Sequence, residues 1–289
     1  HSTGLAKGST IPQQHRRQCR GCMLGSLTRS DVPSVAPYST RGRFLKGERW
    51  GMDFGRTFPT SIWGKTSYVI LVEDQTLFVK LYFINSHTEV WHALREFIPW
   101  CRRTFGAVVK SLKPDSDPIW TSGRSVDPDT AEAKLFSTEF DVTFERTAPY
   151  TQAANVAENV QRPLLALTNT QLVHASLTSK LWEPSADAAA TILNMLPKPG
   201  STRPLLQHDV SPHEAMFGCM PDLSRLAGAF GSLCYVHVAG SKPSQLTNTS
   251  RAALYFGIAP GSSGWRVLML DTMTLATSRM PLWLRKFLK

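Results

Sequence analysis

Three acidic residues from distant parts of the chain have positions suited to metal-dependent chemistry on a phosphodiester. Asp53 interrupts an apolar run, Asp115 follows a predicted strand, and Glu158 lies near the start of a predicted helix. Carboxylates are natural ligands of Mg²⁺, which prefers oxygen. Two such ions, about 3.5–4 Å apart, can activate an attacking oxygen and stabilise a leaving oxygen. Brought together by folding, Asp53, Asp115 and Glu158 would hold Mg²⁺ or Mn²⁺ against such a substrate.

Each of these acids also has an ordinary structural interpretation. Asp53 could be a turn or capping residue, and Glu158 could be a solvent-facing helix residue. The second ligand could be Asp117 instead of Asp115, and the other aspartate would then be a turn residue before Pro118. We favour Asp115 because it is in register with the preceding strand.

The basic charge of the chain is concentrated at its two ends. The formal net charge is +10 over 289 residues. Residues 1–50 carry nine Lys or Arg against two Asp or Glu, residues 51–200 carry fourteen against sixteen, and residues 201–289 carry nine against four. Basic ends around a nearly neutral centre suit a polyanion that is held at the flanks while chemistry occurs in the middle. The alternative is a basic protein with no nucleic-acid role.

Nothing in the sequence indicates a membrane protein or a secreted protein. No apolar run approaches the roughly 20 residues that a membrane-spanning helix needs, and the start of the chain lacks the pattern of a signal peptide. Five cysteines, an odd number, fit a reducing environment better than a disulfide framework. Since the first residue is not Met, we expect a piece of something longer, such as a polyprotein.

The patterning of the chain predicts three regions. Residues 1–45 are polar and basic with little periodicity, which predicts an irregular segment. Residues 46–200 alternate β-branched and aromatic runs with apolar residues at helical spacing, which predicts a mixed α/β core. Residues 201–289 contain short β runs separated by Gly and Pro, which predicts a small β-rich extension. The predicted strands are 68–74, 77–84, 107–112, 142–145, 233–238, 253–258 and 265–270, and the predicted helices are 88–105, 130–140, 153–177 and 181–196.

Several motifs resemble the integrase region of copia-type LTR-retrotransposon Pol polyproteins, in the retroviral integrase superfamily. Residues 148–165 are similar to the signature APYTPQQNGVAERxNRTLL, and residues 212–218 are similar to TPYExWxGxKP. Residues 230–237 and 255–267 are similar to FGCxxYVH and FLGYxPGSKGYRV. The similarity keeps the same order from about Cys19 to the end of the chain. Such collinearity is harder to obtain by chance than any one motif.

The resemblance implies a ribonuclease H-like core, a mixed five-stranded sheet with flanking helices, followed by a small C-terminal β-rich region. It implies a metal-dependent polynucleotidyl transferase that processes 3′ ends and joins DNA strands, with Asp53, Asp115 and Glu158 as its catalytic triad. Integrases of this kind act as multimers on paired DNA ends, so DNA and further copies of the chain are the expected partners. The expected location is the nucleus, after synthesis in the cytoplasm within a polyprotein.

The resemblance also concerns a zinc module in residues 1–45. The family pairs a Cys-x2-Cys with two upstream histidines, and tetrahedral zinc needs all four ligands. Cys19 and Cys22 form half of such a site, while His1 and His15 are the histidines that precede them. We expect a remnant of the module here, with zinc bound in the full-length polyprotein. The alternative is that these are two ordinary thiols.

DNA contacts are expected first from Lys and Arg side chains directed at phosphates. The backbone amides at a helix N-terminus also bind phosphate, so the polar residues just before Glu158 are further candidates. The candidates are Arg41, Arg43, Lys110, Lys113, Gln152 and Asn155.

The chain also departs from the family pattern. Asp115 and Glu158 are 43 positions apart, farther than is usual in the family, and Pro163 lies inside the predicted helix, where it should kink it. The turn before Glu158 lacks the family's glycine. Two alternatives to an active integrase therefore remain: a catalytically decayed DNA-binding or assembly module, and a metal nuclease of the same fold.

Overall fold

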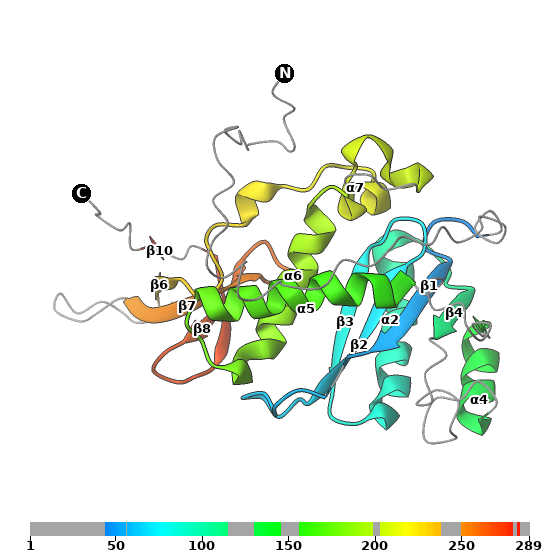
Figure 1. Ribbon diagram of the computed structural model, residues 1–289, viewed down its shortest axis with the longest axis horizontal. Coiled ribbons are helices and arrows are strands. Elements are labelled where there is room, and N and C mark those ends of the chain that lie inside the picture. Colours follow the sequence, from blue (N-terminus) through cyan, green and yellow to red (C-terminus); the bar gives the residue numbers. More distant parts are fainter. Residues whose placement is uncertain are drawn as a thin grey trace.

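The computed structural model describes residues 44–55, 57–114, 130–145, 156–198, 203–237, 250–279 and 282–283. Two five-stranded sheets lie on either side of a pair of long helices, α5 and α6 (Figure 1). The helices of the described part are α2 (Val90–Phe105), α4 (Ala131–Phe140), α5 (Val156–His174), α6 (Trp182–Met195) and α7 (Pro212–Phe217). Short 3₁₀ helices are η2 (His87–Glu89), η4 (Ser179–Leu181), η5 (Pro204–Asp209) and η6 (Leu223–Arg225).

The first sheet is mixed. Its strands are β1 (Arg49–Phe54), β2 (Ser67–Glu73), β3 (Val79–Ile84), β4 (Ser111–Pro114) and β5 (Thr143–Phe144). They lie in the order β3-β2-β1-β4-β5, with β2 antiparallel to its neighbours β1 and β3, and β4 and β5 parallel to β1.

Helices cover both faces of this sheet. Trp50, Met52 and Phe54 of the central strand β1 pack against α2 and α4 on one face. Since successive side chains of a strand point to opposite faces, Asp53 points to the other face. There its neighbour across the ladder, Ile70, packs with α5 and α6. The mixed five-stranded sheet with flanking helices, the ribonuclease H-like core that the resemblance implied, is thereby confirmed.

The strand predicted at 107–112 begins later than expected, at Ser111. The reason lies in its neighbour, because Ser111 pairs with Arg49, the first residue of β1. A local β pattern cannot show where the neighbouring strand begins, so the predicted start was wrong.

The second sheet is antiparallel throughout. Its strands are β6 (Leu233–His237), β7 (Ser250–Ile258), β8 (Trp265–Met269), β9 (Leu275–Ser278) and β10 (Leu282–Trp283), in the order β10-β6-β7-β8-β9. It confirms the C-terminal β-rich region predicted from the sequence.

The second sheet packs on the helices of the core. Phe256 of β7 stacks on Phe230, with ring centroids 4.7 Å apart, and both rings share one apolar cluster with α5 and α6. Gly257 has a φ of +104°, and a Cβ there would lie 3.5 Å from that of Ala188 on α6. The contact with Ala188 leaves room for a Cβ, but the positive φ favours glycine. The junction therefore depends on a backbone that only glycine adopts easily.

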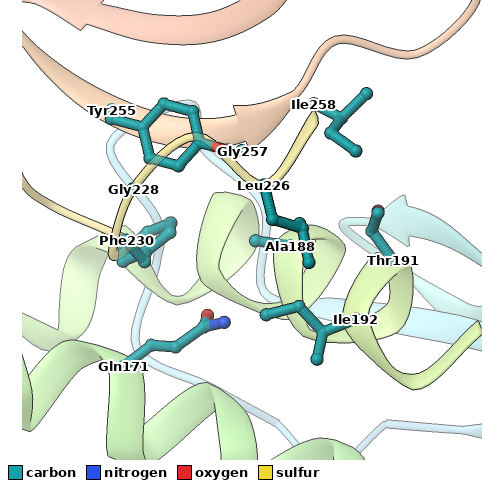
Figure 2. A pocket seen from close by; sticks show the side chains of 10 residues that line it. All are labelled: Gln171, Ala188, Thr191, Ile192, Leu226, Gly228, Phe230, Tyr255, Gly257 and Ile258. Atoms are coloured by element: carbon teal, nitrogen blue, oxygen red, sulfur yellow. The ribbon is translucent and has the colours of Figure 1, made fainter. Parts of the chain in front are cut away.

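A small cavity lies at this junction. Figure 2 shows Gln171 and three α6 side chains on one side of it, with Phe230, Tyr255 and neighbouring residues on the other. Its volume is about 30 Å³. That is room for water but not for a substrate. None of the helices in the described part has the length and apolarity that crossing a bilayer requires.

Removal of the Phe256 ring tests whether the two sheets unfold together. Phe256→Ala is expected to lower the free energy of unfolding by about 3–5 kcal/mol, because it leaves a cavity against the core helices. Urea unfolding followed by tryptophan fluorescence measures the change. Leu275→Ala, at an exposed position of β9, is the control. A separate transition of the second sheet alone would contradict this coupling.

Candidate functional site

Asp53 lies at the carboxyl end of the central strand. It is 9% exposed, and its Oδ1 accepts a hydrogen bond of 2.7 Å from the backbone N–H of Phe54. The preceding residue, Met52, pairs with Pro114, the last residue of β4. The carboxyl ends of β1 and β4 are therefore adjacent. In open α/β sheets, ligands bind outside such strand ends.

Glu158 lies in the first turn of α5 and is partly exposed. Val156, Ala157 and Val160 anchor this end of the helix against the apolar side chains of β2. Gln161 donates a hydrogen bond of 2.9 Å from Nε2 to the carbonyl oxygen of Phe54. Residues three positions apart lie on the same side of a helix. The structure thus brings the side of α5 that carries Glu158 to the strand end that carries Asp53.

Tyr68 of β2 is buried beside these residues. Burial raises the pKa of Tyr68 well above its ordinary value, and the negative charge of Asp53 adds to this effect. Phe58 and Trp182 enclose the ring, with centroids 5.6 and 6.3 Å away. Tyr68 is therefore a neutral, rigidly held neighbour of Asp53.

Sequence reasoning missed both Tyr68 and Gln161. Tyr68 begins an apolar strand, and no local signal separates it from ordinary core residues. Gln161 did have a signal, since the signature motif has an Asn at the corresponding position.

The two lysines near β4 have different surroundings. Lys110 is exposed, and its Nζ lies 2.5 Å from Oε1 of Glu48. The hydrogen bond from Lys110 lowers the pKa of Glu48. Lys113 is paired in register with Gly51 and so lies on the Asp53 face of the sheet. Of the two, Lys113 is the one on the face of the candidate site.

The remaining predicted site residues lie outside the described residues. They are Asp115, Asp117, Cys19, Cys22, Arg41, Arg43, Gln152 and Asn155. Among the residues that the structure describes, no group of three or more His, Cys, Asp or Glu could hold a metal ion. Asp53 and Glu158 are both oxygen donors, which fits the preference of Mg²⁺ and Mn²⁺. They supply two of the three predicted ligands.

A groove of about 900 Å³ lies elsewhere, along β3, α6 and α7. Its two acids are engaged in other contacts, Asp187 with Arg266 at 2.7 Å and Asp222 with Ser224 at 2.6 Å. Neither Asp53 nor Glu158 lines it. The groove is therefore separate from the strand end that carries Asp53.

The chain is similar in sequence to retrovirus-related Pol polyproteins of plant transposons. Over 213 residues, 73% of this chain, the sequence is 26% identical to the retrovirus-related Pol polyprotein from transposon RE1 of Arabidopsis thaliana and 24% identical to that from transposon RE2. Over 263 residues, 91% of this chain, it is 20% identical to the one from transposon TNT 1-94 of Nicotiana tabacum. The chain spans 13%, 14% and 18% of these polyproteins. The resemblance to copia-type Pol polyproteins is thereby confirmed.

No family model matches the chain. Among solved structures, the catalytic core domain of BIV integrase is similar, with 19% identity and a TM-score of 0.39. The match covers 60% of this chain and 95% of that one. The fold assignment rests on the order and directions of the strands in the first sheet.

Gly55→Ala tests how closely the end of β1 is packed. A Cβ at Gly55 would lie 2.8 Å from two ring carbons of Tyr68, and this ring is enclosed on other sides. The variant is expected to lose about 1–3 kcal/mol of unfolding free energy from overpacking. Urea unfolding measures the loss, and in a Tyr68→Leu background the same substitution should cost less. Equal costs in both backgrounds would contradict this contact.

Proposed function

Because the chain resembles a segment of copia-type Pol polyproteins, we propose that it is an integrase. It acts as a metal-dependent polynucleotidyl transferase, which processes 3′ ends of DNA and joins them to a target. The observation that supports this most is the meeting of the α5 turn carrying Glu158 with the strand end carrying Asp53, through the hydrogen bond of Gln161 to Phe54.

Asp53, Glu158 and Asp115 would hold the divalent ions, with Asp117 as the alternative to Asp115. When bound, two Mg²⁺ or Mn²⁺ ions activate the attacking oxygen and stabilise the leaving oxygen, so the protein forms no covalent intermediate. Support for Asp115 comes from the sequence, in which it follows the predicted strand in register.

In this proposal, each group around Asp53 has a different role. The backbone N–H of Phe54 orients the carboxylate of Asp53. The ring of Tyr68, enclosed by Phe58 and Trp182, packs beside the end of β1. Lys113 would attract a DNA phosphate towards this face.

The wider context follows from the same resemblance. DNA ends and target DNA are the proposed partners, further copies of the chain would form the multimer, and the nucleus is the proposed place of action. The alternative of a catalytically decayed DNA-binding or assembly module was raised partly by Pro163. The helix α5 continues across Pro163 from Val156 to His174, so this proline does not end the helix that carries Glu158.

DNA strand transfer and its reversal on a branched oligonucleotide test the proposed activity. With Mn²⁺ or Mg²⁺, joining is expected for the parent chain and is expected to fall to the metal-free level in Asp53→Asn and Glu158→Gln. Comparison of Asp115→Asn with Asp117→Asn identifies the second ligand, since loss is expected in one of the two.

The other outcomes separate the alternatives. Metal-dependent cleavage without joining would indicate a nuclease of the same fold. Salt-sensitive DNA binding without activity in either metal would indicate a decayed binding module.

The salt dependence of DNA binding tests the two lysines. Lys113→Ala is expected to reduce the slope of log K against log salt by about 1, as for the loss of one phosphate contact. Lys110→Ala is expected to change it less, because Lys110 lies at the opposite end of β4 and pairs with Glu48. Fluorescence anisotropy at several salt concentrations measures both slopes. A larger change for Lys110→Ala would contradict the assignment of the DNA-facing side.

A further inference from the structure

We propose that Gln161 is a positioning residue that holds Glu158 against Asp53, an inference that rests on the proposed function. Gln161 joins the two elements directly. Its Nε2 donates to the carbonyl oxygen of Phe54 at 2.9 Å, and Phe54 follows Asp53 in the chain. On α5, Gln161 lies one helical turn after Glu158. One amide therefore links the backbone beside the first acid to the helical turn of the other.

This end of α5 also has apolar contacts with the core. Ala157, Val160 and Leu164 pack against the sheet and the neighbouring helix. Apolar burial is not directional, so it allows the helix to slide or rotate by small amounts. A hydrogen bond to a backbone carbonyl is directional and defines both the distance and the rotation. Gln161 supplies a directional contact at this end.

Pro163 makes such a contact more important. In a regular helix the N–H of residue 163 would bond to the carbonyl of Asn159, one residue after Glu158. Proline has no N–H, so this bond of the helix is missing. The turn that carries Glu158 is consequently tied less firmly to the rest of α5, and an external hydrogen bond compensates.

The acceptor of this hydrogen bond is itself held in place. Tyr68 lies against Gln161 and Asp53, and the rings of Phe58 and Trp182 enclose it. The backbone N–H of Gly55 donates to the carbonyl of Tyr68 at 2.7 Å. The end of β1 is thus anchored immediately after Phe54. A misplacement of about 1 Å costs on the order of 100-fold in rate where geometry controls chemistry, so this rigidity matters for paired metal ligands.

The chain offers a matched control on the same helix. Gln171 is also an α5 glutamine, and its Oε1 accepts a hydrogen bond of 2.9 Å from Ser185 of α6. Gln171→Met removes a side-chain hydrogen bond from α5 without touching β1. Gln161→Met removes the hydrogen bond to Phe54 with the same change of side chain.

The first measurement, on the full chain, is the affinity for Mn²⁺ alone. Electron paramagnetic resonance of the free ion reports how much Mn²⁺ is unbound. Residues that support metal ligands typically contribute roughly 10–100-fold in metal affinity. Gln161→Met is expected to weaken Mn²⁺ binding by this factor, while Gln171→Met leaves it within about twofold of the parent.

Hydrogen exchange of the Val160 and Arg162 amides is the second measurement and needs no metal. Exchange is expected to be several-fold faster in Gln161→Met than in Gln171→Met. Equal exchange rates, or equal Mn²⁺ affinities in the two variants, would overturn the positioning role.

A different result would overturn the proposed function instead. If Asp53→Asn leaves Mn²⁺ binding unchanged, the metal site is not the one proposed. The exchange rates then still decide whether Gln161 holds the first turn of α5 to β1.

Discussion

The parallel pairing of β1 with β4 is the constraint on which the candidate site depends. Parallel neighbours bring their carboxyl ends to one edge of the sheet. Asp53 at the end of β1 therefore lies beside the end of β4, where Met52 pairs with Pro114. A slip of one residue in this register would turn every side chain of β4 to the opposite face. The position of Lys113, on the face of Asp53, depends on the same register.

The second element of the site, α5, is held from two sides. Its apolar face packs on β2, and the same apolar cluster continues through α6 to Phe230, Phe256 and Leu268 of the C-terminal region. Residues far along the chain thus help to fix the helix that carries Glu158. The apolar contacts give the helix its place, and the hydrogen bond from Gln161 to Phe54 gives it direction. Apolar packing fixes the position of α5, and the hydrogen bond also fixes its rotation, because only the hydrogen bond depends on angle.

Much of this arrangement could be predicted from local patterns. Alternating strand patterns and helical spacing gave the mixed α/β core and the β-rich tail, because these periodicities reflect burial on one or two faces. The motif around Glu158 identified the helix that meets Asp53. The predicted start of β4, at residue 107, was wrong. The strand begins at Ser111, because there it pairs with Arg49, the first residue of β1. The pairing of Lys110 with Glu48 is a contact that no sequence spacing reveals.

The sequence by itself determined the residue types that could hold a divalent ion, the helical setting of Glu158 and the resemblance to copia-type polyproteins. These properties are local, since they follow from a residue and its near neighbours along the chain. Only the tertiary structure decided that Gln161 reaches Phe54 and that Tyr68 lies beside Asp53. Both contacts join residues that are distant in sequence. They depend on the register of a sheet and the seating of a helix, which the packing of the whole core determines.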